Sequence, residues 1–285
     1  MSFFHDFGAN PFLATGLLAG LLASLACGII GPYVVTRRIV ALGGAIAHIA
    51  VGGLGAAIFL AHRFPGCLGW LHPIHGAALI SVFSAVLLAF VHLRVRERAD
   101  TLIGALWAVG MATGILLIKL TPGYYTELMS YLFGNLSFVS PADLRLMIGL
   151  DVTIVGVALL FHKRFLAICL DPEQAELQGV SLLVTELVML VLVALTVILL
   201  TQVVGLILVI ALLSLPAATV GHHLRRLAPM IFASIALATV LTTVPRIAVY
   251  GTKISPEPAI VLAAAAAFLL SLLVRWWRWR RQVGA

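Results

Sequence analysis

The sequence predicts an all-α, polytopic helical membrane protein with about nine transmembrane helices. Of its 285 residues, 62% are hydrophobic and only 10% are charged, whereas soluble domains carry about 25% charged residues. Apolar runs of about 20 residues, long enough to cross a bilayer, recur along nearly the whole chain. No charged segment with a cleavage site precedes the first run, so this run is predicted to be a retained span and not a signal peptide.

Nine apolar runs account for the predicted helices. Their approximate bounds are 11–36, 39–61, 76–95, 101–120, 145–161, 183–201, 203–221, 228–245 and 258–274. In chain order they are separated by Arg37-Arg38, "HRFPGCLGWLHPIH", "RVRERAD", "TPGYYTEL…SPADLR", "HKRFLAICLDPEQAELQGVS", Thr201-Gln202, "HHLRRLAP" and "RIAVYGTKISPEP". The short break at Thr201-Gln202 is the weakest, and without it the number of spans would be eight.

The basic residues predict the orientation, because Lys and Arg are enriched in cytoplasmic loops. With the N-terminus outside and the C-terminus in the cytoplasm, 13 of the 18 Lys and Arg residues fall inside. The five that fall outside are Arg63, Lys119, Arg145, Arg246 and Lys253. Residues 275–285 then form a cytoplasmic tail, "RWWRWRRQVGA". Its place directly after an apolar run favours membrane anchoring over nucleic-acid binding, so no nucleic-acid partner is expected.

Few ionisable residues lie within the predicted spans, and His48, Asp151 and Glu186 are the main ones. Such a residue costs about 2.5–3.5 kcal/mol in hydrocarbon, so it usually faces the bundle interior or a water-filled path. Glu186 lies about one turn from the cytoplasmic end and could reach the surface, whereas Asp151 is deeper. His48 is either a neutral imidazole bonded to a backbone carbonyl of a neighbouring helix or a metal or proton contact.

Two glycine pairs flank His48 in the segment "GGAIAHIAVGG". Gly43 and Gly44 precede the histidine, and Gly52 and Gly53 follow it. Their lack of side chains allows either close packing of neighbouring helices or an open space beside His48 that suits a small ion. The sequence leaves both interpretations open.

The cytoplasmic loop 162–182 contains the segment "DPEQAELQGVS". Asp171 suits the position that caps a helix N-terminus, and Pro172 suits the first helical position. Gly179 suits the left-handed conformation that ends many helices. The segment therefore predicts a short helix between two spans.

The chain carries none of the common catalytic signatures. It lacks the phosphate-binding loop G-x-x-x-x-G-K-[ST], the H-E-x-x-H pattern and the G-x-S-x-G pattern. Its three cysteines, Cys27, Cys67 and Cys169, have no zinc-site spacing. Energy for any transport must therefore come from a partner protein or an ion gradient.

Six segments, in chain order, resemble the membrane subunit of the zinc/manganese-type ABC importers. They are "GPYVVTRRIVALGGAIAHIAVGGLG", "ADTLIGALWAVGMATGILL", "ELMSYLFGNLSFVSPADL", "DPEQAELQGVS", "VVGLILVIALLSLPAATV" and "SPEPAIVLAAAAAFLLSLL". The resemblance implies one permease domain, residues 1–285, without catalytic activity or a permanently bound cofactor. The implied substrate is a divalent transition metal ion, zinc or manganese first and iron next, carried across the inner (cytoplasmic) membrane.

The resemblance also implies the partners and the residues that serve them. Two permease copies, expected to be identical, pair in the lipid bilayer, and an extracytoplasmic metal-binding protein docks near Glu127 and Tyr131. Cytoplasmic ATPase subunits bind and hydrolyse ATP. The residues expected to contact the ATPase are Asp171, Pro172, Glu173, Ala175 and Gly179. The residues expected along the metal path are His48, Asp151 and Met111.

The chain departs from the family pattern at two positions. Gly44 stands where many members carry an aspartate, four residues before the histidine. Ala108, beside Trp107, stands at about the place where zinc-type members carry a histidine. A proton- or sodium-coupled carrier that uses Asp151, Glu186 and His48 stays an alternative, as does, less readily, an intramembrane enzyme. The loop histidines His62, His72 and His75 form a further metal-binding candidate.

Overall fold

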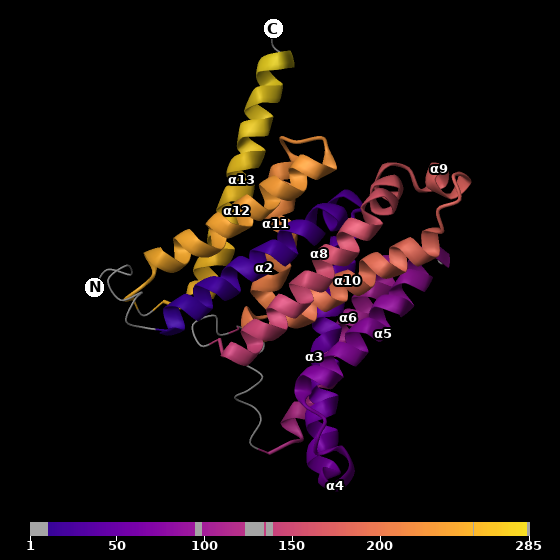
Figure 1. The fold of residues 1–285 in the computed structure, drawn as a ribbon, viewed down its shortest axis with the longest axis vertical. Helices are drawn as coiled ribbons and strands as arrows, with labels where there is room; N and C mark the ends of the chain where they lie inside the picture. Colours follow the sequence, from indigo (N-terminus) through magenta and orange to yellow (C-terminus); the bar gives the residue numbers. More distant parts are fainter. Residues whose placement is uncertain (1–10, 95–98, 123–133, 135–138, 253, 284–285) are drawn as a thin grey trace.

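The computed structural model describes the chain except residues 1–10, 95–98, 123–133, 135–138, 253 and 284–285 (Figure 1). Every element in the described part is an α-helix, which confirms the predicted all-α class there. The helices are α2 (Pro11–Thr36), α3 (Val40–Arg63), α4 (Pro65–Leu68), α5 (Pro73–Arg94), α6 (Ala99–Lys119), α8 (Pro141–Leu170), α9 (Pro172–Leu177), α10 (Leu182–Val203), α11 (Leu206–Gly221), α12 (Leu227–Ala248) and α13 (Pro256–Val283).

Each of the nine predicted apolar runs coincides with one of these helices. Seven helices of the described part, α2, α3, α5, α8, α10, α12 and α13, are long and apolar enough to cross a membrane. The apolar parts of α6 and α11 are shorter, at Ile103–Lys119 and Leu206–Gly221. The number of nine crossings and the outside position of the N-terminus therefore stay predictions.

Two helices continue well beyond the apolar runs that predicted them. Helix α8 starts at a capping box, in which Ser140 and Asp143 bond each other's backbone N–H, and it ends only at Leu170. Much of the predicted loop 162–182 is therefore helical. Helix α13 likewise includes most of the tail 275–285, where Arg280 and Arg281 stack on Trp276 and Trp277. Hydropathy identifies only the part of a helix that suits hydrocarbon. The charged ends of a helix are therefore not predicted from it.

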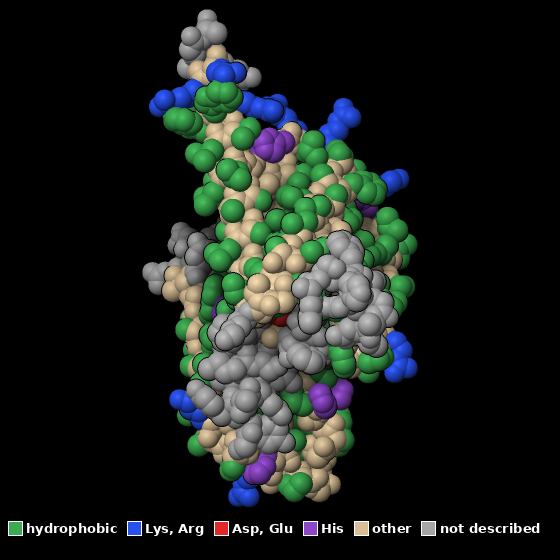
Figure 2. Space-filling view, turned by 90° about the vertical axis from the view of Figure 1, so that its left-hand side faces the viewer, with side chains coloured by type: hydrophobic (Ala, Val, Ile, Leu, Met, Phe, Trp, Pro, Cys, Tyr) green, Lys and Arg blue, Asp and Glu red, His purple; other side chains and the backbone are tan. Residues whose placement is uncertain are grey.

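The basic side chains are unevenly distributed over the surface. Figure 2 shows a broad middle zone rich in hydrophobic side chains and a concentration of Lys and Arg at the end where α13 finishes. In Figure 1 that end also carries α9 and the connection between α11 and α12. This distribution agrees with the charge bias on which the predicted orientation rests.

The weakest predicted break, at Thr201-Gln202, corresponds to a real turn three residues further on. Helix α10 ends at Val203 and α11 begins at Leu206. Gly205 between them has φ +83°, a left-handed conformation that glycine adopts without steric cost. The two apolar runs are therefore separate helices.

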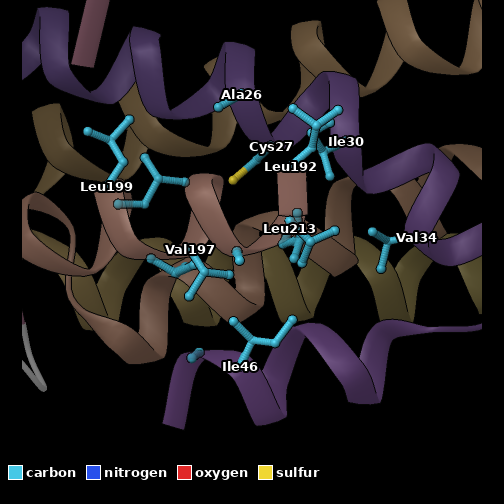
Figure 3. Close-up of a cluster of buried hydrophobic side chains, with 14 of the residues drawn as sticks. Ala26, Cys27, Ile30, Val34, Ile46, Leu192, Val197, Leu199 and Leu213 are labelled. Atoms are coloured by element: carbon cyan, nitrogen blue, oxygen red, sulfur yellow. The ribbon is translucent and has the colours of Figure 1, made fainter. Parts of the chain in front are cut away.

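The core forms where α2 and α10 meet their neighbours. Helix α2 packs against α8, α11 and α12, and α10 packs against α5 and α8. In Figure 3 the side chains of Ala26, Cys27 and Ile30 from α2 lie near Leu192 and Leu199 from α10. Helix α3 packs against α5 and α6. These contacts join the helices into one bundle in the described part.

Glycines bring α3 close to both of its main neighbours. A Cβ atom on Gly52 would lie 2.7 Å from the carbonyl oxygen of Gly110 in α6. Gly53 makes an even closer approach to the backbone of Gly76 in α5. A side chain at either position would push the helices apart, so close packing explains this glycine pair.

A buried ion pair joins Arg37, the first residue after α2, to Glu186 of α10, and it corrects one expectation. The Glu186 side chain is 1% exposed, and its Oε2 lies 2.9 Å from Arg37 Nη2. Arg37 also donates a hydrogen bond to the backbone carbonyl of Ile168 in α8. The expectation that Glu186 reaches the surface is therefore wrong, because Arg37 compensates its charge inside the protein.

We expect Arg37→Met to lower the thermal stability of the protein strongly. Removing one partner of a buried pair costs about 3–5 kcal/mol, since the remaining charge stays buried, whereas replacing both partners is often nearly neutral. Thermal unfolding of the purified protein in detergent should therefore rank wild type and Arg37→Met/Glu186→Leu above Arg37→Met alone. A single variant as stable as the double variant would contradict a stabilising role for this pair.

Candidate functional site

His48 lies between α3 and α6 and contacts two residues of α6. Its Nδ1 atom lies 3.2 Å from Met111 Sδ. Its ring stacks on Trp107, with ring centroids 4.3 Å apart and ring planes 18° from parallel. Trp107 and Met111 are four residues apart, so they share one face of α6. In the described part, the partner found for His48 is this thioether and not a backbone carbonyl.

Of the four glycines around His48, Gly44 is the one that borders this site. It lies one helical turn before His48, and a Cβ atom there would be 3.5 Å from the Trp107 ring, an ordinary contact distance. Gly43 instead faces Leu213 of α11 and Val193 of α10. Gly44 and His48 therefore form the part of α3 that faces this site, and Trp107 limits the space beside them.

The donor atoms of this site suit a transition metal ion. Neutral imidazole binds zinc, copper, iron and nickel, and thioether sulfur is a soft ligand. Among the described residues, however, no group of three or more His, Cys, Asp or Glu could hold a metal. One imidazole and one thioether form an incomplete ligand set, because a metal site with protein ligands usually has at least three.

Asp151 occupies a different place from His48. It lies on α8, which packs against α2, and it neighbours the thiol of Cys27 on α2. Its side chain is 3% exposed, and neither carboxylate oxygen has a hydrogen-bond partner within the described residues. The contacts found for His48 and for Asp151 thus involve different helices, so these contacts do not join the two predicted path residues.

The short helix predicted from "DPEQAELQGVS" is present as α9 (Pro172–Leu177). The Asp171 side chain accepts hydrogen bonds from the backbone N–H groups of Glu173 and Gln174 at 3.0 and 3.1 Å. Gly179 has φ +83°, and its N–H donates to the Glu176 carbonyl while the next N–H donates to Ala175. These paired bonds form a Schellman motif. The predicted N-cap and left-handed glycine are confirmed.

Helix α9 is anchored on one side and open on the other. Ala175 is buried, and a cavity of about 250 Å³ between α8 and α9 is lined by Leu166, Leu170 and Gln174, among others. Leu170 and Leu177 are 78% and 89% exposed. One side of α9 thus packs against α8, and Leu177 at its end lies open on the surface.

The histidines His62, His72 and His75 come only partly together, and the first and last of them lie at the ends of helices α3 and α5. His72 and His75 have ring centroids 6.3 Å apart, and His75 Nδ1 accepts a hydrogen bond from the His72 backbone N–H. His62 does not join them in a group of three possible metal ligands within the described residues. The other two residues predicted for the outer face, Glu127 and Tyr131, lie outside the described residues.

Sequence reasoning missed several polar partners because they come from distant parts of the chain. The Tyr33 hydroxyl lies 2.6 Å from His162 Nδ1, across 129 positions, and Arg37 pairs with Glu186 across 149. The stacking of Trp107 on His48 was also missed. The one available signal was the four-residue spacing of Trp107 and Met111, which places an aromatic ring and a thioether together.

The bundle of long apolar helices defines the class of multi-pass membrane proteins. A family model described as the ABC 3 transport family matches residues 9–275. The chain therefore belongs to the ABC 3 transport family, and the family predicted from the six segments is confirmed.

Individual relatives match nearly the whole length of the chain. An uncharacterized membrane protein of Synechocystis is 39% identical over 264 residues, which cover 93% of this chain and 91% of that protein. The manganese transport system membrane protein MntC of Halalkalibacterium halodurans is 28% identical, over 98% of this chain and 95% of its own. The solved structure of PsaBC from Streptococcus pneumoniae in complex with Fab matches with a TM-score of 0.82 and 26% identity, covering 94% of both chains.

Proposed function

We propose that this chain is the permease subunit of an ABC importer that carries a divalent transition metal ion across the inner membrane. The observation that carries the proposal is the contact between His48 Nδ1 and Met111 Sδ inside a chain of the ABC 3 family. Nitrogen and sulfur donors beside a bundle helix suit a passing metal ion. The manganese-transport name of one relative supports the same substrate class.

One copy of the chain offers only two donor atoms, so the proposal pairs two copies of the chain around the metal ion. A second copy of the chain, placed with its own α3–α6 face opposite, would contribute a second His48 and Met111 and bring the donor set to four. In the described part of α6, Trp107 and Val109 are 37% and 60% exposed. Such exposed apolar side chains are compatible with a partner or with lipid, and the proposal assigns this face to the second copy.

The energy source in this proposal is a separate pair of cytoplasmic ATPases. They would bind α9 and its exposed leucines, so that Asp171, Pro172, Glu173, Ala175 and Gly179 form or hold the docking surface. An extracytoplasmic metal-binding protein would deliver the ion at the opposite end, near Glu127 and Tyr131. The permease itself would hydrolyse nothing.

Donor chemistry ranks the candidate metals. Imidazole and thioether favour zinc and iron(II) over manganese, which prefers carboxylate and carbonyl oxygen. The name of the Halalkalibacterium relative points instead to manganese. The side chains place zinc first, and the manganese-transport name of the relative then places manganese second, with iron third. Element-by-element metal content of cells with and without the chain tests this order.

Vesicles that contain the chain and its ATPase test the mechanism. We expect metal uptake only with ATP and only when the ATPase is present. Uptake driven by a proton or sodium gradient alone would contradict the proposal and favour a coupled carrier. The ion pair of Glu186 with Arg37 argues against Glu186 as a coupling group, because its carboxylate already has a fixed partner inside the protein.

We expect Gly44→Asp to shift metal preference toward manganese. The substitution adds a carboxylate one turn before His48, on the same face of α3, and a Cβ there has only an ordinary contact with Trp107. Competition between zinc and manganese in the uptake assay measures the shift, expected to be about tenfold. Gly43→Asp, whose side chain would face α10 and α11, serves as the control. An unchanged preference in Gly44→Asp would remove this position from the path.

A further inference from the structure

A second cavity lies at the end of the bundle that carries α9. Its volume is about 1000 Å³, and its lining residues come from α2, α8, α11, α12, α13 and the connections between them. Leu166 and Leu170 of α8 border both this cavity and the groove beside α9. The cavity is thus separate from the α3–α6 site of His48, and the proposed function does not use it.

The charged residues that line this cavity are all basic or potentially basic. They are Arg38, Arg225, Arg226, Arg275, His162 and His222. None of its lining residues is an Asp or Glu, and no ion pair of these four arginines is found within the described residues. A concave surface lined by charges of one sign concentrates the positive potential. The cavity therefore favours an anion.

Two local features support a binding site over an incidental cluster. Arg38 has φ +60°, a left-handed conformation that a non-glycine residue rarely adopts and that tends to occur at functional sites. His222 is positioned by Ser271, whose Oγ lies 2.9 Å from His222 Nδ1. Burial, together with the positive charge of Arg275 and with His223, lowers the pKa of His222, which agrees with an electropositive environment.

The other lining residues and the position of the cavity indicate the kind of anion. Cys169, Leu166, Met230 and Phe268 give it an apolar part. The arginines stand where apolar helices end: Arg38 closely follows α2, and Arg225 and Arg226 directly precede α12. A ligand with a phosphate and a hydrocarbon chain satisfies both parts at once. Arginine binds phosphate through paired hydrogen bonds, and basic pockets between membrane helices bind lipid head groups.

We propose that this cavity binds the phosphate head group of an anionic phospholipid, with the start of an acyl chain on its apolar part. The bound lipid neutralises the arginines that follow α2, precede α12 and lie within α13. It thereby connects three helices at the end of the molecule that carries α9. The interaction is independent of metal chemistry, so its test does not depend on the proposed transport function.

Lipid binding to the purified full chain, measured by native mass spectrometry, tests the proposal. The probes are phosphatidylglycerol, with phosphatidylcholine as the neutral comparison. We expect selective phosphatidylglycerol binding that weakens about tenfold or more in Arg225→Gln/Arg275→Gln, because two charges facing the head group are lost. The matched control Arg164→Gln/Arg278→Gln removes two charges outside the cavity lining and should bind as wild type does. Melting temperatures of both variants check that the fold is retained.

Several outcomes would overturn the proposal. Equal weakening in the control pair would show general surface attraction and no defined site. Inorganic phosphate that binds wild type but not the cavity variant, without selective lipid binding, would assign the site to a free anion. If the cavity variant instead loses the ATPase subunit while phosphatidylglycerol binding is unchanged, the cavity belongs to an acidic segment of that partner.

Discussion

His48→Ala is expected to reduce metal uptake by more than about tenfold while leaving the bundle assembled. The substitution removes the imidazole that lies against Met111 and stacks on Trp107. Even the loss of a residue that only supports a metal ligand commonly costs 10- to 100-fold in affinity or activity, so loss of the ligand itself should cost at least as much. Uptake into vesicles that contain the chain and its ATPase measures the effect.

Two further variants separate the path from general effects of histidine loss. His62→Ala, in an exposed position at the end of α3, removes a histidine far along the same helix and should transport normally. Met111→Leu keeps the apolar volume but removes the sulfur, so it should reduce uptake less than His48→Ala and chiefly for the softer metals. Normal uptake by His48→Ala would exclude His48 from the metal path.

Gly179→Val is expected to weaken binding of the ATPase subunit and to reduce ATP-driven uptake in proportion. At φ +83° a side chain costs roughly 1–2 kcal/mol, and a β-branched one is especially unfavourable. A Cβ atom on Gly179 would meet nothing within 4 Å, so the effect acts through the backbone and the Schellman motif that ends α9. Co-purification of the ATPase and uptake are the two measurements.

The chain supplies a matched control for this variant. Gly251 has φ +78° and equally open surroundings, but it lies in the connection between α12 and α13. Gly251→Val therefore carries a similar backbone cost without touching α9, and ATPase binding should be retained. Gly179→Asn should also retain it, because asparagine tolerates the left-handed conformation. Equal loss of the ATPase in both valine variants would reflect general destabilisation and contradict the role of α9.

The helices could be predicted because the physics that forms them is local. A run of about 20 apolar residues must satisfy its backbone hydrogen bonds internally, and all nine runs are helical. The ends of α9 were also predictable, since Asp171 and Gly179 act on neighbouring backbone groups. The ends of α8 and α13 were not, because charged residues continue a helix after hydropathy has fallen.

The neighbours of the polar residues could not be predicted in the same way. The sequence around Gly52 and Gly53 was as compatible with an open path as with close helix packing. The positions of α5 and α6 in the structure show that these glycines allow close packing. Similarly, the sequence places Glu186 within an apolar run and Arg37 directly after another, but it does not show that the two side chains meet. Contacts over more than a hundred positions depend on the arrangement of whole helices, which the local pattern does not determine.

The length of α8 has a mechanical consequence. Its 30 residues span about 45 Å, whereas the hydrocarbon core is about 30 Å thick, and α9 is attached at its Leu170 end. If α8 pivots near its capped Ser140 end as a rigid rod, a tilt of about 10° displaces α9 by about 8 Å. A small tilt of α8 within the bundle therefore produces a larger displacement of α9. In the opposite direction, a force applied to α9 is transmitted along α8 to the helices that α8 contacts.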